Sequence, residues 1–521
     1  MSKRMIGMTL LVFFITTVSY AGDPPRIIES LSMPSKILGE EVRFSVSLPV
    51  GYYQSDHSYP VVYLLHGLGD DETSWLEYGR ISQFADKAEE DGEIVPMIFI
   101  MPQGFRTYYV NDYKGSFRYQ DMFIEELVPY IDQQFRTLKE NKQRALMGYS
   151  MGGFGVFNLA VRHPEVFGVS VPLSMSVRTD IQYMTEDPRG WDEQWGRLFG
   201  TPGKKDSARL TPWYLQNSPF HIPYGADSTA FRKIRLYMDN GDKEQTLCRA
   251  NETLHILMEE KKIPHEFRVR EGGHSFDYWC SALPDALRFI SDAFEEKPYR
   301  GDFRPEVSFP PVPRDRIRHL AEGKEKAMVV VPEDYDETNR RYPILFLIGF
   351  LNETERENIA ALTDRATADN VVGPMILAFL PVTDSVSMAS LIRKTSDQFR
   401  IRSGFRMKVV AGTGEGASIA LSMALIPESF GGCLITGGTL FPEQVTGMLN
   451  GITRETMKRT PLFVDAPCHG KYTGGNGTLH MLLRDREIYH EYRVREGDGS
   501  GNWLTGGFPE MIRFAARQFH R

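Results

Sequence analysis

A serine between glycines is the first residue in this sequence whose setting indicates chemistry. The stretch "ALMGYSMGGFGVFNLA" contains Gly148-Tyr149-Ser150-Met151-Gly152, which fits the pattern Gly-x-Ser-x-Gly. An apolar strand pattern precedes these residues and a helical pattern follows them, so the glycines lie where a strand turns sharply into a helix. Such a turn exposes the hydroxyl of Ser150 and points the backbone N–H of Met151 at the place where an oxyanion would form. The motif therefore predicts that Ser150 is a nucleophile.

A serine hydroxyl is a weak nucleophile until a base removes its proton, so a histidine is expected on a later loop. The stretch "EGGHSFDYW" supplies His274 directly after the strand pattern "HEFRVR", and its two glycines give the loop freedom to aim the ring. We expect His163, His255 and His265 to be structural because they fall within helical or strand patterns. His274 is therefore the predicted general base.

A second oxyanion donor is expected from the loop after the first long apolar strand. In "LLHGLGDDETSW" the turn His66-Gly67-Leu68-Gly69 can present a backbone amide, that of Leu68, toward Ser150. Together with the amide of Met151, it would stabilise the tetrahedral intermediate of acyl transfer.

Four blocks of the sequence occur twice and in the same order, which indicates a duplicated domain. The block "SYPVVYLLHGLGDDE" matches "RYPILFLIGFLNETE", "PMIFIMP" matches "PMILAFLP", "HPEVFG" matches "IPESFG", and "HEFRVREGGH" matches "HEYRVREGDG". We expect the second copy to keep the fold without the catalyst, because all three functional positions are lost. The replacements are Gly414 for Ser150, Gly499 for His274, and Gly349-Phe350 for His66-Gly67.

The predicted base needs a carboxylate that holds its tautomer, and the loop "MDNGDKEQ" offers three. Asp239 has a counterpart in the second copy, Asp465 of "PLFVDAPCHG", although that copy has no nucleophile. Asp239 is therefore predicted to be structural. The second copy has no carboxylate opposite Asp242 or Glu244. Glu244 is the first candidate for the acid, and Asp242 is the alternative.

Short runs of β-branched and aromatic residues, such as "VVYLLHG" and "MIFIMP", alternate with longer helical patterns in each copy. Apolar runs of this length suit strands covered on both faces, so the alternation indicates a mostly parallel sheet flanked by helices. The fold class is α/β. We predict a signal peptide at residues 1–21, a catalytic domain at 22–297, a proline-rich linker at 298–313 and a non-catalytic domain at 314–521.

The first copy is longer than the second between the nucleophile and the histidine, and the extra material corresponds largely to residues 176–225. This segment contains Trp191, Trp195 and Trp213, whose rings could form a cover over the acyl site or a platform for sugars. The three tryptophans are candidate substrate-binding residues. The alternative is a surface insertion with its own small core.

The N-terminus and the composition restrict where the protein works. Lys3 and Arg4 precede an apolar run, and Ser19-Tyr20-Ala21 offers small residues for cleavage without a following cysteine, so we expect a secreted or periplasmic protein. A formal charge of −8 without a basic block argues against nucleic acid and anionic membrane as partners. The four cysteines are too few for a disulfide framework and are expected to be buried or free.

Five motifs in this order and spacing resemble a known family: "YLLHGLGDDETSW", "GYSMGGFG", "ELVPYID", "GDKE" and "EGGHSFDYW". Over about residues 26–295 the chain is similar to the esterase D superfamily of α/β-hydrolases, and most similar to carbohydrate esterase family 1. The resemblance implies two tandem α/β-hydrolase domains. It also places the acid three residues after Gly241, at Glu244. Aspartate is commoner at that position in the family, which keeps Asp242 open.

The resemblance further implies a serine esterase that removes feruloyl or acetyl groups from plant cell-wall polysaccharides such as xylan. No cofactor or metal is expected. A serine peptidase or an acyltransferase of the same fold remains an alternative, as does a glycan-binding scaffold protein.

Overall fold

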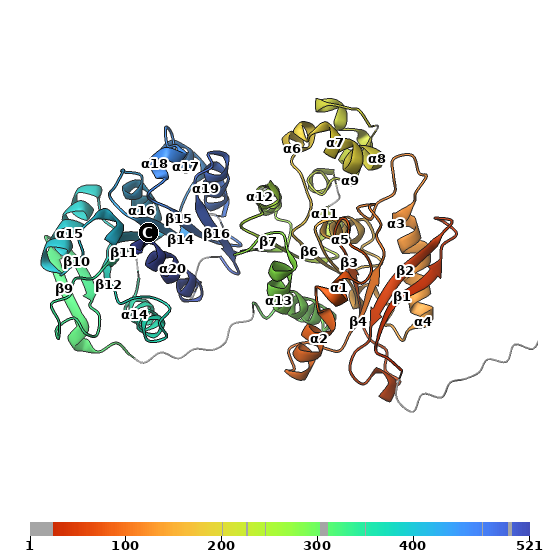
Figure 1. The fold of residues 1–521 in the computed structure, drawn as a ribbon, viewed down its shortest axis with the longest axis horizontal. Helices are drawn as coiled ribbons and strands as arrows, with labels where there is room; N and C mark the ends of the chain where they lie inside the picture. Colours follow the sequence, from red (N-terminus) through yellow and green to blue (C-terminus); the bar gives the residue numbers. More distant parts are fainter. Residues whose placement is uncertain are drawn as a thin grey trace, which may run out of the picture.

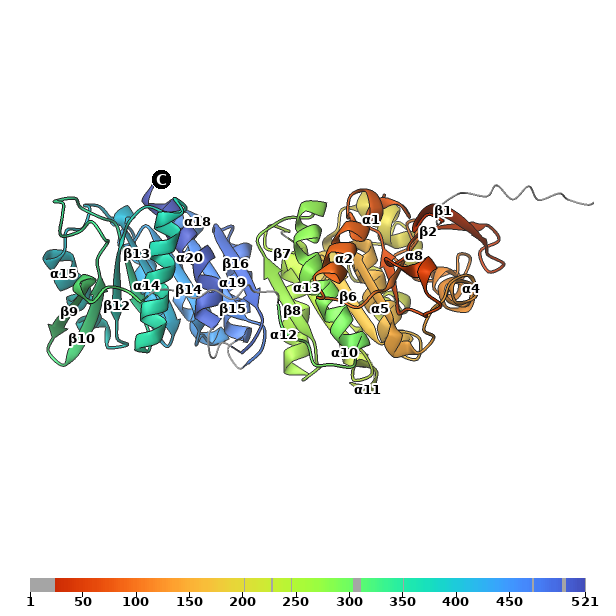
Figure 2. The same ribbon diagram turned by 90° about the horizontal axis from the view of Figure 1, so that it is seen from below.

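One mixed β-sheet runs through the whole molecule and carries helices on both faces (Figures 1 and 2). The computed structural model describes residues 24–200, 202–225, 228–244, 246–302, 311–349, 351–470, 473–498 and 503–520. The expected signal peptide at residues 1–21 lies outside the described residues, as does half of the expected linker, residues 303–310.

The first half of the chain forms eight strands of this sheet, in the order β1-β2-β4-β3-β5-β6-β7-β8. β1 and β2 are antiparallel at the outer edge, and the strands from β4 to β8 run parallel. The strands are β1 (Ile27–Pro34), β2 (Glu41–Ser47), β3 (Val61–Leu65), β4 (Ile98–Pro102), β5 (Arg144–Tyr149), β6 (Val169–Leu173), β7 (Arg235–Gly241) and β8 (Glu266–Arg270).

Burial on both faces explains why the central strands are continuous apolar runs. Every residue of β3 is buried, and its side chains alternate between two separate apolar cores. Tyr63 packs in the core beneath α4 (Val128–Gln134), α5 (Met151–Arg162) and α12 (Thr246–Glu260). Leu64 packs in the core beneath α2 (Ile81–Glu90) and α13 (Phe276–Phe294).

The second half repeats the strand order of the first, because β9-β10-β12-β11-β13-β14-β15-β16 follows the same pattern from its own outer edge. The expected fold of two tandem α/β-hydrolase domains is confirmed. The strands are β9 (Ile317–Glu322), β10 (Glu325–Val330), β11 (Ile344–Ile348), β12 (Ile376–Leu380), β13 (Lys408–Gly414), β14 (Gly432–Gly438), β15 (Leu462–Pro467) and β16 (His490–Arg495). The longer helices are α14 (Glu353–Ala368), α15 (Ser385–Gln398), α16 (Gly416–Ala424), α19 (Thr473–Asp485) and α20 (Trp503–Phe519).

The two half-sheets meet edge to edge at β8 and β16, which run antiparallel (Figure 2). The register pairs Val269 with Val494, and these two valines are equivalent positions of the sequence repeat. Helices α12 and α19, which are also equivalent, pack against each other beside the strands. Contacts between equivalent elements are the mark of an approximate two-fold axis, so the halves meet as the subunits of a symmetric dimer do.

This joint buries polar side chains from both halves. Glu252 of α12 is 0% exposed and accepts a hydrogen bond from the hydroxyl of Tyr492 at 2.9 Å. His469 follows β15, and its Nδ1 lies 3.1 Å from Oε1 of Glu259. The neighbouring Cys468 thiol, Glu259 and Glu266 together raise the pKa of His469 to about 12, so this ring is a cation at neutral pH. The joint is therefore held by specific polar contacts as well as by apolar packing.

A segment between β6 and β7 stands over one end of the first half, at the top of Figure 1. It contains α6 (Asp180–Thr185), α7 (Pro188–Gly190), α8 (Arg197–Phe199) and α9 (Pro212–Asn217). In the second half the corresponding connection, between β14 and β15, carries α17 (Pro442–Met448) and α18 (Arg454–Met457). We call residues 176–225 the cap.

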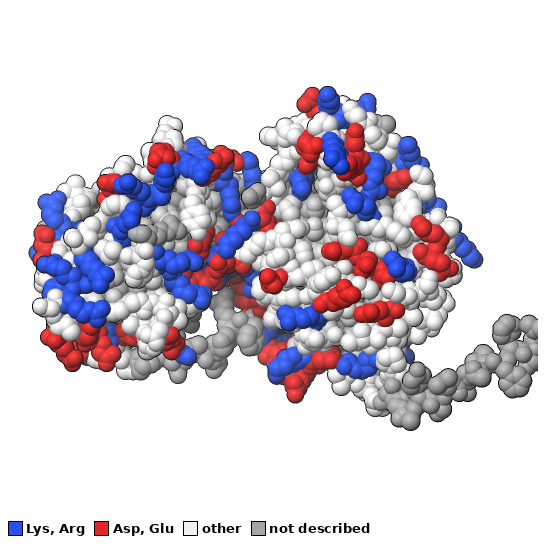
Figure 3. Space-filling model, in the orientation of Figure 1, with Lys and Arg blue, Asp and Glu red and all other residues white. Residues whose placement is uncertain are grey.

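Further features of the molecule are its charged surface, its cysteines and the length of its helices. Figure 3 shows basic and acidic side chains interspersed over the face that it draws. All four cysteines are buried and free, as expected. Among the described residues, no helix combines the length and the apolar character needed to cross a bilayer.

The joint should give the protein a pH-dependent stability that depends on Glu252. Burial raises the pKa of this carboxyl from 4.5 to about 8, so between these values the folded chain holds a proton that the unfolded chain releases. The stabilisation is complete below pH 4.5 and is lost as the pH rises toward 8. We expect the fall in Tm between pH 5 and pH 8 to be smaller in Glu252→Gln than in the wild type.

Glu260 is an exposed residue of the same helix, and Glu260→Gln is the matched control, which should keep the wild-type pH dependence of Tm. Equal pH dependence in the wild type and in Glu252→Gln would contradict this account of the buried carboxyl.

Candidate active site

The turn between β5 and α5 holds Ser150 in a strained conformation. Its φ is 58° and its ψ is −117°, which a residue with a side chain rarely adopts. The turn is tight because α5 begins directly against the end of β3: a Cβ on Gly152 would lie 2.1 Å from the carbonyl oxygen of Leu65. Glycine is therefore required at position 152, and Ser150 is held at the N-terminus of the helix, as the motif predicts.

The structure brings the predicted base and one of the two candidate acids into line with Ser150. His274 Nε2 lies 2.9 Å from Oγ of Ser150, and His274 Nδ1 lies 3.2 Å from Oε2 of Glu244. With the proton on Nδ1 directed at the carboxylate, Nε2 is free to accept the serine proton. The side chain of Glu244 is 0% exposed and that of His274 is 38% exposed, so the base reaches the solvent while its partner does not.

The other oxygen of the acid is held by groups that sequence reasoning missed. Oε1 of Glu244 accepts hydrogen bonds from the hydroxyl of Ser174 and from the backbone N–H of Gly241. Ser174 in turn accepts a hydrogen bond from Nε1 of Trp279 at 2.8 Å. The ring of Trp279 stacks on Tyr149 beside the nucleophile and meets His274 edge to face. This chain of donors fixes the carboxylate in its orientation toward the imidazole.

The remaining carboxylates of the loop face away from the histidine. Oδ2 of Asp242 lies 2.6 Å from Nη1 of Arg493, which belongs to the second half of the chain. Asp239 is buried and binds Arg270 at 2.8 Å, and its counterpart Asp465 binds Arg495 at 2.9 Å. The geometry therefore favours Glu244 over Asp242 as the acid, and it gives Asp239 the same ion pair as its counterpart in the second half.

The two residues predicted to supply the oxyanion hole border the nucleophile. Met151 is the first residue of α5, and Leu68 lines the same cavity as Ser150. His66 supports the turn that carries Leu68, because its ring contacts the carbonyl of Gly67 at 2.8 Å and accepts from the N–H of Gly104 at 2.7 Å. Burial lowers the pKa of His66, which keeps the ring neutral and able to accept this bond.

A cavity of about 380 Å³ opens beside the triad. Polar side chains from the cap and from the acid loop form much of its wall, and sequence reasoning missed them because nothing in their local pattern marks them. The lining residues are Leu68, Tyr108, Ser150, Ser176, Arg178, Gln194, Lys243, Glu244, Thr246, Leu247 and His274.

The three tryptophans of the cap do not line this cavity, which corrects their prediction as substrate-binding residues. Trp191 is 0% exposed and Trp195 is 1% exposed, and both pack against Tyr183 inside the cap. Trp213 is partly buried and donates from Nε1 to the carbonyl of Asn111. Large aromatic rings in a short segment are the material of its own core, and the polar Gln194 beside them reaches the cavity instead.

The family described as putative esterase matches the chain over residues 35–290. Residues 35–290 are an esterase-like α/β-hydrolase domain. The strained serine, the histidine and the buried glutamate all lie within this domain.

Several known proteins are similar to part of the chain. An endo-1,4-beta-xylanase/feruloyl esterase of Xylanibacter ruminicola is 36% identical over 152 residues, which cover 27% of this chain and 20% of that protein. An esterase of Mycobacterium tuberculosis is 28% identical over 270 residues, which cover 48% of this chain and 54% of that protein. A solved ferulic acid esterase is 27% identical, with a TM-score of 0.43, and covers 51% of this chain and 98% of its own. The chain thus spans from 20% to 54% of the length of these two curated relatives.

The second half keeps the turn of the esterase-like domain with a glycine in place of the serine. Gly414 ends β13 with a φ of 53°, close to that of Ser150. A Cβ on Gly416 would lie 2.1 Å from the carbonyl oxygen of Ile348, as one on Gly152 would from Leu65. The counterpart of Glu244 is Gly470, and the counterpart of His274, Gly499, lies outside the described residues. The packing of the turn is conserved between the halves although the hydroxyl is absent.

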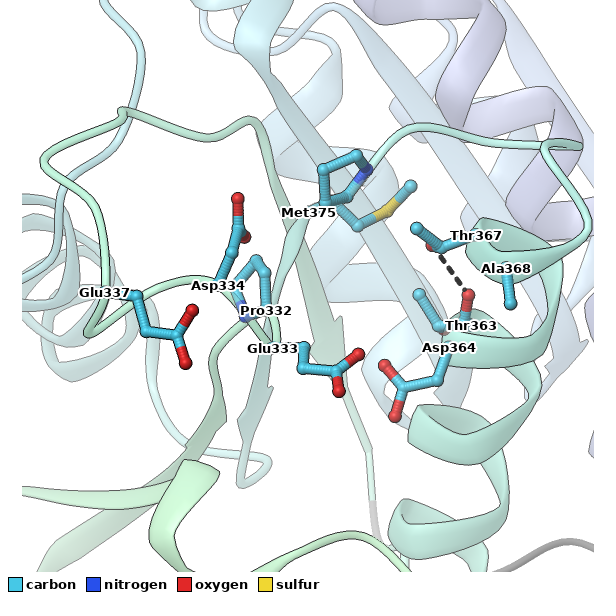
Figure 4. A pocket seen from close by; sticks show the side chains of 10 residues that line it. Pro332, Glu333, Asp334, Glu337, Thr363, Asp364, Thr367, Ala368 and Met375 are labelled. Atoms are coloured by element: carbon cyan, nitrogen blue, oxygen red, sulfur yellow. Dashed lines mark hydrogen bonds between the residues drawn. The ribbon is translucent and has the colours of Figure 1, made fainter.

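A further cavity, of about 450 Å³, lies in the second half away from this turn, between the loop after β10 and helix α14 (Figure 4). Carboxylates dominate its wall, and Figure 4 shows those of Glu333 and Asp364 turned toward each other. Asp364 is paired with Arg316 at 2.8 Å, and Asp334 with Arg340 at 2.9 Å. This cavity is larger than the one at Ser150, and its lining residues include no serine, cysteine or histidine.

Removing the charge of the acid tests the triad directly. Glu244→Gln should lower kcat by about 10²–10⁴-fold on a small ester such as p-nitrophenyl acetate, because the amide neither fixes the tautomer of His274 nor stabilises its imidazolium. Circular dichroism and Tm should stay near those of the wild type, because the hydrogen bonds of Ser174 and Gly241 can be kept by the amide oxygen. A kcat within threefold of the wild type would show that Glu244 is not the acid.

Proposed function

We propose that the protein is a serine esterase that hydrolyses acyl esters on plant cell-wall polysaccharides, with feruloyl or acetyl groups of xylan as its substrates. The observation that carries the proposal is the continuous contact from Glu244 through His274 to Ser150. Membership of residues 35–290 in an esterase family supports the reaction. The printed activities of relatives, which include feruloyl esterase and acetyl esterase, support the substrate class.

The geometry is suited to acyl-enzyme chemistry. His274 takes the proton of Ser150 as Oγ attacks the ester carbonyl, and the amides of Leu68 and Met151 stabilise the resulting oxyanion. The intermediate collapses, the bond between the acyl carbon and the sugar oxygen breaks, and His274 gives its proton to that departing oxygen, which leaves as a hydroxyl group. A water molecule, deprotonated by His274, then attacks the acyl-serine, and release of the acid restores Ser150.

The cavity fits an acyl group attached to a polar leaving group. Its volume of about 380 Å³ lies within the range typical of small-molecule sites. Arg178, Gln194 and Lys243 supply hydrogen-bond donors around its wall. A sugar bearing the ester has many hydroxyl acceptors, so these donors are suited to hold it while the acyl carbonyl faces Ser150.

We further propose that the protein is exported and that the second half is not catalytic. The sequence of residues 1–21 supports export, and the substrate is a polysaccharide outside the cell. The glycines that replace Ser150 and Glu244 in the second half support the loss of catalysis there.

Two measurements test the function. A fluorophosphonate probe should label the folded protein, and Ser150→Ala should abolish the labelling because the reactive oxygen is gone. Incubation with feruloylated and acetylated xylan fragments should release ferulic acid or acetate, measured by liquid chromatography, and the same variant should release neither. The variant is the matched control for ester hydrolysis that occurs without the enzyme.

Different failures have different meanings. Labelling at Ser150 without release of either acid from any fragment would defeat the substrate class and leave a serine hydrolase with another acyl substrate. Cleavage of a peptide, or transfer of the acyl group to an added alcohol in place of water, would identify a peptidase or an acyltransferase. No labelling of the folded protein would defeat the enzyme and favour a scaffold.

A further inference from the structure

We infer that the second half of the chain positions the acid of the triad, by binding the loop between β7 and α12 through Arg493 and Arg484. The inference rests on the proposed function, because it concerns the geometry of the same triad. Arg493 lies in β16 and Arg484 lies in α19, so both belong to the half without a nucleophile. Neither contacts the cavity, and they are positioning residues.

The contacts are made to Asp242, two residues before the acid. Nη1 of Arg493 lies 2.6 Å from Oδ2 of Asp242, and both side chains are 2% exposed. The guanidinium of Arg484 donates to the backbone carbonyl of Asp242. The backbone N–H of Tyr492 adds a longer bond, 3.4 Å, to the same carboxylate oxygen. The second half therefore holds both the side chain and the backbone of one residue in the acid loop.

Asp242 passes this constraint to both catalytic loops of the first half. Its Oδ1 accepts from the backbone N–H of Gly272, two residues before His274, at 3.1 Å. The N–H of Lys243 donates back to the carbonyl of Gly272 at 2.8 Å. The N–H of Gly241 donates at 2.9 Å to Oε1 of Glu244 itself. One carboxylate therefore links the loop of the acid, the loop of the base and the second half of the chain.

The joint provides an internal comparison, because its approximate symmetry places Arg268 where Arg493 stands and Cys468 where Asp242 stands. The N–H of Phe267 donates to Sγ of Cys468 at 3.2 Å, just as the N–H of Tyr492 donates to Asp242. Arg268, however, turns to Asp302 at 2.8 Å.

On the side of the second half, His469 pairs across the joint with Glu259 at 3.1 Å, and among the described residues no arginine–carboxylate pair crosses the joint at the position equivalent to Arg493 and Asp242. The buried arginine–carboxylate bond between the halves, that of Arg493 with Asp242, occurs on the side of the triad. The two sides thus differ in the kind of pair that they form, and Asp242 is the carboxylate that also bonds the loop of the base.

The bond between Arg493 and Asp242 matters for catalysis because its loss would change the position of the loop that carries Glu244. Removal of Arg493 leaves the carboxylate of Asp242 buried without its cation, which is strongly unfavourable, so the loop would shift to hydrate it. Glu244 would move with the loop, and a displacement of about 1 Å in such a constellation can cost about 10²-fold in rate.

The test compares Arg493→Met with Arg268→Met in the full-length protein. Both variants remove a buried arginine from the same joint, with side chains 2% and 1% exposed, and each takes the nearest cation from a carboxylate, Asp242 or Asp302. Each arginine also pairs with a second carboxylate, Arg493 with Glu510 and Arg268 with Glu266. With p-nitrophenyl acetate, Arg493→Met should lower kcat at least tenfold with KM within twofold of the wild type. Arg268→Met should keep kcat within threefold although its Tm falls by a similar amount.

A second readout is independent of turnover. The Nδ1 proton of His274 that bonds Glu244 should give a downfield proton resonance, absent in His274→Ala. We expect this resonance to shift or broaden in Arg493→Met and to stay in place in Arg268→Met. If the wild type hydrolyses no ester, the proposed function fails, and the resonance still reports on whether Arg493 positions Glu244.

Arg493→Lys guards against a variant that does not fold. Lysine keeps the charge beside Asp242 but loses the planar fork, so we expect a folded protein with kcat between those of the wild type and Arg493→Met. Unchanged kcat and an unchanged resonance in folded Arg493→Met, or equal losses in Arg493→Met and Arg268→Met, would overturn the inference. If the Met variant does not fold, a Lys variant with wild-type kcat and resonance would overturn it equally.

Discussion

The close approach of a helix N-terminus to the end of a neighbouring strand determines the architecture of each half. In the first half the backbone at Gly152 lies against the carbonyl of Leu65, and in the second half Gly416 lies against Ile348 in the same way. No side chain fits at either point, so the chain must turn from strand to helix with a residue of positive φ between them. Ser150 occupies that position in one half and Gly414 in the other. The packing of helix against strand thus imposes the strained turn in both halves. In the first half, this turn holds Ser150 at the N-terminus of α5.

The joint between the halves determines what the second half can do. Edge strands of a sheet leave hydrogen-bonding groups unpaired, and pairing β8 with β16 covers one edge of each half-sheet. The same contact brings α19 and β16 next to the loop that carries Glu244. The second half, in which Gly414 stands opposite Ser150, is in this way connected to the loop of Glu244 through Asp242, and neither Arg493 nor Arg484 lines the cavity.

Much of this could be predicted from the sequence, because the signals are local or repeated. The sharp turn at Ser150 and the loop position of His274 follow from the patterns of strand, turn and helix. The repeated blocks predict the two similar topologies. The choice between Glu244 and Asp242 could not be made from the loop alone, since the partner of Asp242 is Arg493, 251 residues away in the chain. Trp191 and Trp195 were placed wrongly for a related reason: whether an aromatic ring faces a cavity or a core depends on the packing of the whole cap. The bond of Ser174 to Glu244, and that of Trp279 to Ser174, leave no pattern in the sequence.

Because the edge-to-edge joint lies within one chain, the contact between the two halves does not weaken when the protein is diluted. Two separate chains that met through β8 and β16 would come apart as their concentration fell, and each would then expose the edge of its sheet. Because both strands belong to one polypeptide, the local concentration of each partner is set by the connecting chain and does not change when the protein is diluted. The contact of Arg493 with Asp242 therefore does not depend on the protein concentration.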